Sequence, residues 1–138
     1  MSAAVPAPGR RAVLVVDDDD RVRAVVRAVL EADDFEVAEA ADGPSALALL
    51  AADDWHGEAG GRPNVLVLDV MMPGMDGIEV CRQVDHTTTK VLMLTAREDL
   101  ATRDASAAAG ADAFLAKPFS AVELLDAIER LSADEPAV

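Results

Sequence analysis

The strongest constraint in this 138-residue sequence is a series of short, almost uninterrupted apolar runs that alternate with longer helix-like segments. The runs predict strands at Ala12 to Val16, Phe35 to Ala40, Val65 to Leu68, Val91 to Leu94 and Ala113 to Leu115. Three of the five are nearly continuous Val, Leu and Met, which is typical of parallel strands covered by helices on both faces. With 51% hydrophobic residues, the chain can bury the core of one α/β domain.

The intervening segments have helical periodicity and recognisable ends. In the first, apolar residues recur three and four positions apart, so we expect one stripe to be buried and the arginines to face water. Pro44 suits the first turn of the second helix. Asp76 and Ser120 each precede a glutamate by three residues, which resembles a capping box at the start of the third and the last helix.

The fourth helix is predicted from about Glu98 to Ala109, with Gly110 as its stop. Beyond Leu100 its apolar residues are all alanine, so little apolar area holds it to the sheet. A weakly held helix is a candidate moving part. Alanine also permits close helix packing, and the sequence leaves both explanations open.

Charge and composition narrow the class of protein. Asp and Glu number 26 against 12 Lys and Arg, and the net charge of -14 should repel nucleic acid and anionic lipid. The chain has no apolar stretch of membrane-spanning length and no signal-like start, so we expect a cytoplasmic protein. We predict a flexible tail at residues 1–11, one domain at 12–131, and a tail or linker start at 132–138.

Polar residues follow four of the predicted strands. Asp17 and Asp18 follow the first, Asp69 the third, Thr95 the fourth and Lys117 the fifth. Ligands of open parallel sheets bind at the carboxyl ends of strands, so these side chains converge if their strands are neighbours. Several carboxylates in one place require a cation, and oxygen ligands without Cys or His indicate Mg²⁺ or Mn²⁺ rather than zinc.

The pattern suits phosphoryl transfer. A carboxylate such as Asp69 can act as a nucleophile toward phosphorus and form an acyl phosphate. Lys117 offers a positive charge and Thr95 a hydroxyl donor for phosphoryl oxygens, while the small Ala96 leaves space for the phosphate.

Over about Ala12 to Leu131 the sequence resembles the receiver domain of bacterial two-component response regulators. The motifs that carry the resemblance stand in order along the chain: Val15 to Asp19, Leu68 to Gly77, Leu92 to Ala96, Gly110 to Asp112, and Lys117 to Phe119. The resemblance implies a flavodoxin-like (βα)5 fold, a doubly wound parallel sheet of strand order 2-1-3-4-5. It also implies a signalling switch that catalyses only its own phosphorylation and dephosphorylation.

By the same resemblance, Asp69 accepts a phosphoryl group from a histidine kinase or histidine phosphotransfer protein. Asp18, Asp69 and the Met71 carbonyl hold Mg²⁺, with Asp17 assisting through water. Lys117 and Thr95 contact the phosphoryl group.

The resemblance further implies how the signal leaves the site. Thr95 moves toward the phosphate, Phe114 turns inward, and the face formed by the fourth helix, fifth strand and fifth helix changes. The Lys117–Pro118 bond is expected to be cis.

Two departures from the family pattern concern assembly and output. Family members with a winged-helix output usually pair an acid with an arginine across a dimer face, and here the two positions are Ala113 and Ala127. No output domain follows Leu131, which favours a single-domain regulator or a piece of a longer protein.

Two alternatives remain beside the switch. Haloacid-dehalogenase-like phosphatases also use a strand-end Asp, a Thr, a Lys and Mg²⁺, and Asp17 to Asp19 loosely matches their opening motif. They need a further acidic motif after the lysine, which this sequence lacks. A degenerate receiver that acts only as a binding module is the other alternative, and the complete set of site residues argues against it.

Overall fold

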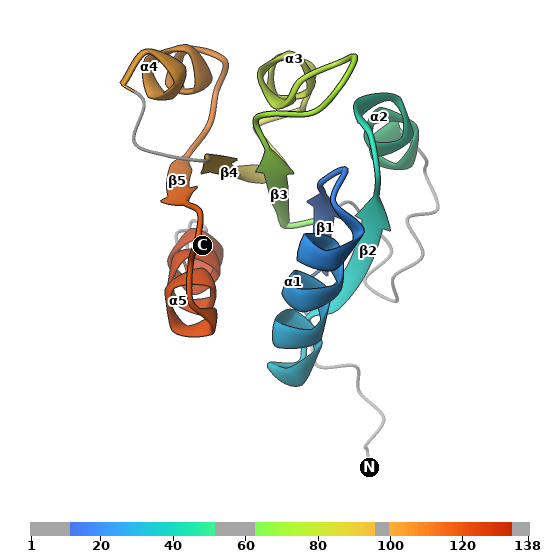
Figure 1. The fold of residues 1–138 in the computed structure, drawn as a ribbon, viewed down its shortest axis with the longest axis vertical. Helices are drawn as coiled ribbons and strands as arrows, with labels where there is room; N and C mark the ends of the chain where they lie inside the picture. Colours follow the sequence, from blue (N-terminus) through green and yellow to red (C-terminus); the bar gives the residue numbers. More distant parts are fainter. Residues whose placement is uncertain (1–11, 52–62, 96–99, 134–138) are drawn as a thin grey trace.

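The computed structural model describes residues 12–51, 63–95 and 100–133, which form alternating strands and helices (Figure 1). The strands are β1 (Ala12–Val16), β2 (Glu36–Ala40), β3 (Val65–Asp69), β4 (Lys90–Thr95) and β5 (Ala113–Ala116). The helices are α1 (Asp20–Ala32), α2 (Gly43–Ala51), α3 (Gly77–Arg82), α4 (Leu100–Ala108) and α5 (Ala121–Ala133). Each strand begins and ends within one residue of the apolar run that predicted it.

All strand pairs are parallel, and the sheet order is β2-β1-β3-β4-β5. This confirms the flavodoxin-like doubly wound fold. Because β1 lies between β2 and β3, Val13 is level with Val37 on one side and with Val65 on the other. The end of β1 therefore adjoins the end of β3.

The core has two layers, one on each face of the sheet. Helices α1 and α5 cover one face, and α2, α3 and α4 cover the other (Figure 1). Successive β1 residues alternate between the layers: Val13 and Val15 pack with the α1 and α5 side, whereas Leu14 and Val16 pack with the opposite side. Burial on both faces explains why β1, β3 and β4 carry no polar alternation.

The predicted helix caps are present. The Asp76 side chain accepts a hydrogen bond from the Glu79 N–H at 3.0 Å. Ser120 and Glu123 form a reciprocal capping box, with side chain to backbone hydrogen bonds of 2.9 and 3.0 Å. Helix α5 continues through Ala133, beyond the predicted domain end at residue 131, while the predicted tail 1–11 lies outside the described residues. Among the described helices, none has the length and apolar character needed to span a membrane.

Helix α4 is the least buried of the helices on its face. Among its residues whose side chains are described, only Ser106 is fully buried. Its first predicted residues, 98 and 99, lie outside the described part of the chain. The described residues of this alanine-rich helix therefore bury little apolar area, which is consistent with weak anchoring, one of the two explanations that the sequence leaves open.

The turn between β3 and α3 brings a helix very close to the end of β3. The Gly77 N–H donates to the Val70 carbonyl oxygen at 3.0 Å, and Gly74 has φ of 79°, which favours glycine. A Cβ on Gly77 would overlap the Asp69 carbonyl oxygen and lie 2.9 Å from the Val70 Cα. Glycine at position 77 is therefore needed for this close approach.

We expect Gly77→Ala to lower the free energy of unfolding by about 1 to 3 kcal/mol, because its methyl group must displace main chain. Gly43→Ala is the matched control, since the three atoms nearest to its methyl group belong to the Met75 side chain, which can shift more easily than main chain. Urea unfolding of both variants and the wild type measures the difference. A Gly43→Ala variant as unstable as Gly77→Ala would contradict this account.

Candidate functional site

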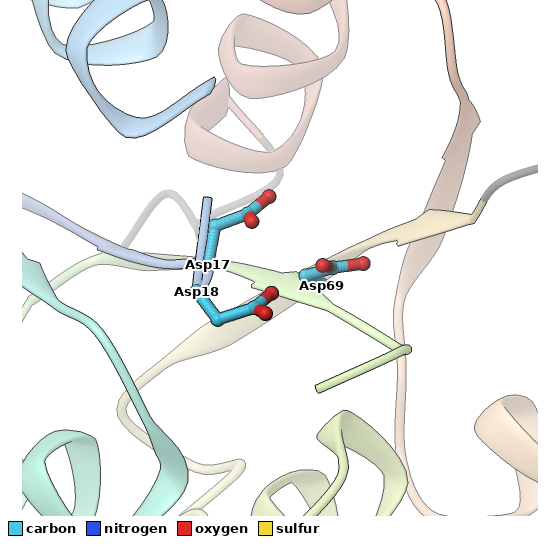
Figure 2. A group of neighbouring side chains, drawn as sticks. All are labelled: Asp17, Asp18 and Asp69. Carbon is cyan, nitrogen blue, oxygen red and sulfur yellow. The ribbon is translucent and has the colours of Figure 1, made fainter. Parts of the chain in front are cut away.

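Three carboxylates meet at the carboxyl ends of the two central strands. Asp17 and Asp18 directly follow β1, and Asp69 ends β3, the neighbour of β1 in the sheet. One oxygen of each lies within 4.8 Å of the others, and Figure 2 shows the three side chains gathered at these strand ends. Asp17 is fully buried and Asp69 is 4% exposed, whereas Asp18 is open to solvent. The cluster is thus buried on one side and accessible on the other.

Lys117 is the cation of this cluster. Its Nζ lies 3.2 Å from Asp17 Oδ2 and 3.4 Å from Asp69 Oδ2. The Lys117 backbone N–H donates to the Thr95 carbonyl oxygen at 2.7 Å, which fixes the lysine beside the end of β4. Burial acts to lower the pKa of Lys117, but the Asp69 and Asp17 carboxylates outweigh it and raise the pKa. The ammonium therefore stays charged.

Asp69 has an unusual carboxyl group. Burial raises its pKa to about 6, and the charge of Asp17 acts in the same direction. Lys117 and the Met71 N–H, which donates to Asp69 Oδ1 at 3.2 Å, only partly oppose the rise. Apart from this shift, the cluster has three carboxylates and one ammonium group in contact with two of them, so negative charge is in excess.

This excess charge and the donor chemistry fit a hard divalent cation. The donors are carboxylate oxygens, which Mg²⁺ and Mn²⁺ prefer, and the exposed Asp18 leaves an open side for water ligands. Met71 follows the cluster in the chain and is 70% exposed. The structure thus brings together the carboxylates that the sequence assigned to a metal.

Two further predicted site residues, Thr95 and Phe114, lie on the neighbouring strands β4 and β5. Thr95 is the last residue of β4 and is buried. Leu94, which precedes Thr95, pairs in register with Asp69 of the neighbouring strand β3. Ala96 lies outside the described residues. Phe114 is a half-buried residue of β5 that packs against the core layer under α2, α3 and α4. The Arg103 guanidinium of α4 lies 5.1 Å from the centre of its ring.

Sequence reasoning missed one residue that contacts the site. The arginines of α1 were expected to face water, but the Arg23 side chain is only 14% exposed. Its Nη1 donates to the Asp17 carbonyl oxygen at 2.7 Å, and its Nε donates to Glu39 Oε1 at 3.1 Å. The available signal was Glu39, an acidic residue near the end of β2 that stands between the buried residues Ala38 and Ala40.

Comparison with known proteins is consistent across sequence and structure. The sequence model of the response regulator receiver domain matches residues 13–129. Response regulator MprA of Mycobacterium avium (strain 104) is 47% identical over 115 residues, which are 82% of this chain and 47% of that protein. The chain thus spans about half the length of the curated relatives it matches.

Two solved structures show the same likeness. The chemotaxis protein CheY4 of Vibrio cholerae has a TM-score of 0.76 at 32% identity, with 88% of this chain and 98% of that chain covered. The BeF3-activated DrrB receiver domain has a TM-score of 0.75 at 31% identity, with 88% and 97% covered.

The raised pKa of Asp69 predicts a pH-dependent gain of stability in Asp69→Asn. The folded metal-free protein binds the Asp69 proton more tightly than the unfolded chain does, so ionisation of Asp69 costs stability as pH rises toward and through about 6. We expect Asp69→Asn to raise the free energy of unfolding by about 1 to 2 kcal/mol at pH 8, and by little at pH 4. Urea unfolding with a chelator present measures both values. An equal gain at the two pH values would show that ionisation of Asp69 is not the cause.

Proposed function

Because the chain belongs to the response regulator receiver domain family, we propose that it is a cytoplasmic switch phosphorylated on Asp69 by a histidine kinase or histidine phosphotransfer protein. The family assignment makes the domain a signalling switch rather than a classical enzyme, and disfavours the haloacid-dehalogenase-like alternative. The observation that supports Asp69 as the acceptor is its position: it ends a central strand, between Lys117 and two further carboxylates.

Each residue of the cluster has a distinct task in phosphoryl transfer. An Asp69 carboxylate oxygen attacks phosphorus, the new P–O bond forms as the P–N bond to histidine breaks, and the released ring nitrogen takes up a proton. With a pKa of about 6, Asp69 is mostly ionised at neutral pH and ready to attack. Lys117, freed from its contact with Asp69, binds a phosphoryl oxygen.

The metal site follows from the same cluster. Asp18, Asp69 and the Met71 carbonyl would hold Mg²⁺, or Mn²⁺ in its place, and Asp17 would assist through water. When bound, the cation neutralises the carboxylates and the phosphoryl oxygens. The support for this assignment is the oxygen-only donor set and the charge excess around Asp69.

Phosphorylation is read by residues beside the acceptor. Thr95 donates its hydroxyl to the new phosphoryl group, and Phe114 turns inward into the space beside it. The Arg103 guanidinium of α4 lies over the Phe114 ring, so a movement of the ring changes a contact of α4. Because α4 buries little, the face formed by α4, β5 and α5 can change at small cost.

The acceptor role is tested by incubating the protein with acetyl phosphate and Mg²⁺ and measuring its intact mass. We expect a gain of one phosphoryl group in the wild type and none in Asp69→Asn, because the amide is a poor nucleophile. Asp76→Asn is the matched control on the same loop and should gain the group, since asparagine also caps α3. Mass gain in Asp69→Asn, or none in the wild type, would disprove the proposal.

The task of Lys117 is tested by separating metal binding from phosphoryl uptake. In Lys117→Ala we expect Mg²⁺ affinity to be kept or increased, because a competing positive charge is removed from Asp17 and Asp69. The phosphorylation rate should fall by about tenfold or more. Lys90→Ala, which removes the same charge at the opposite end of β4, should change neither. A parallel loss of Mg²⁺ affinity in Lys117→Ala would refute this role.

A further inference from the structure

We propose that Arg23 is a positioning residue of the metal and phosphoryl site: by holding the Asp17 carbonyl group it sets the direction in which the Asp18 carboxylate points. The inference rests on the proposed function, because it gives Arg23 a task in the Mg²⁺ site of the switch. It concerns a residue of α1, outside the strand ends that carry the reacting groups.

The first observation is a short hydrogen bond to the peptide group between two metal-site aspartates. Arg23 Nη1 donates to the Asp17 carbonyl oxygen at 2.7 Å. That oxygen belongs to the planar peptide unit that joins Asp17 to Asp18. Fixing the plane therefore fixes how the chain enters Asp18.

The second observation is that the Asp17 side chain has several partners, whereas the Asp18 side chain has none among the described residues. The Asp17 carboxylate is buried, accepts from the Asp19 N–H at 2.9 Å and pairs with Lys117. Asp18 is exposed, and within the described part of the chain its carboxylate has no hydrogen-bond or ion-pair partner. The backbone alone places Asp18, so the hold that Arg23 exerts on this backbone matters most for Asp18.

The third observation is that Arg23 is itself held in place. Its Nε donates to Glu39 Oε1 at 3.1 Å and its Nη2 pairs with Asp20 Oδ1 at 2.5 Å. One planar guanidinium thus binds three groups at once: Glu39 of β2, Asp20 at the start of α1, and the Asp17 carbonyl oxygen. A lysine ammonium cannot reach all three together, so the arginine is specifically suited to this position.

Arg27 provides a matched comparison within the same network. It lies one turn further along α1, and its Nη1 donates to the other oxygen of Glu39, Oε2, at 2.6 Å. It also pairs with Glu31 at 2.9 Å, but no hydrogen bond joins it to Asp17. Loss of Arg27 therefore removes the same charge and disturbs Glu39 while leaving the Asp17 contact in place.

A purely electrostatic role and a positioning role of Arg23 predict opposite changes in Mg²⁺ affinity when Arg23 is replaced. If Arg23 acted only through its charge, Arg23→Met would strengthen Mg²⁺ binding, because a cation near the acidic cluster disfavours a second cation. If Arg23 positions Asp18, the same change weakens Mg²⁺ binding. Removing a group that orients a metal ligand commonly costs tenfold or more in affinity.

The experiment is a calorimetric titration of the full chain with Mg²⁺ alone, in the wild type, Arg23→Met and Arg27→Met, with urea unfolding of each. We expect Mg²⁺ affinity to fall about tenfold in Arg23→Met and to be unchanged or slightly higher in Arg27→Met. An unchanged or higher affinity in Arg23→Met overturns the proposal. So does an equal fall in Arg27→Met, because that would assign the effect to the shared network.

Two outcomes need separate treatment: an Arg23→Met variant that does not fold, and a wild type that does not bind Mg²⁺. If Arg23→Met does not fold, Arg23→Lys takes its place: it keeps the charge but cannot serve Asp17, Glu39 and Asp20 together. A partial fall in Mg²⁺ affinity then supports the proposal, and wild-type affinity overturns it. If the wild type itself binds no Mg²⁺, the proposed function fails as well, whereas wild-type binding with an unaffected Arg23→Met removes only the role of Arg23.

Discussion

The main physical constraint on this structure is the repulsion between carboxylates that the parallel pairing of β1 and β3 brings together. Asp17 and Asp69 end neighbouring strands, and both are buried, so their charges are poorly screened by water. Lys117 contacts both and compensates one charge, while the pKa of Asp69 stays raised to about 6. The unbalanced charge suits the proposed cation site, and it surrounds the carboxylate that we propose as the phosphoryl acceptor.

The rest of the fold holds these groups against their repulsion. The sheet is apolar on both faces, and its two core layers fix the strands that carry Asp17 and Asp69. Gly77 lets α3 begin directly against the Asp69 main chain, and Arg23 ties α1 and β2 to the Asp17 carbonyl group. By contrast, α4 is weakly buried and contacts Phe114 through Arg103. The proposed acceptor thus lies in a well-packed part of the sheet, on the same domain as a helix that buries little and can move at small cost.

Much of the fold and site could be predicted because local patterns carried the information. The uninterrupted apolar runs predicted the strands, and Ser120 with Glu123 predicted a cap that the structure shows in full. The convergence of Asp17, Asp69 and Lys117 followed from their places at strand ends, once those strands were assumed to be neighbours. Arg23 could not be predicted in this way: its helical spacing placed it with the exposed arginines, and its partners lie on β2 and after β1.

The sequence by itself determined which segments are strands and helices, which residues end the strands, and the oxygen-only chemistry of the cluster, because these depend on neighbouring residues or residue type alone. The strand order did not follow from the runs, since the apolar character of a run does not say which strands are neighbours, and the resemblance to a family supplied it. Only the tertiary structure decided the raised pKa of Asp69, the burial of Arg23 and the ring contact between Arg103 and Phe114. These properties depend on burial and on partners distant in the chain, and such partners meet only when the sheet assembles.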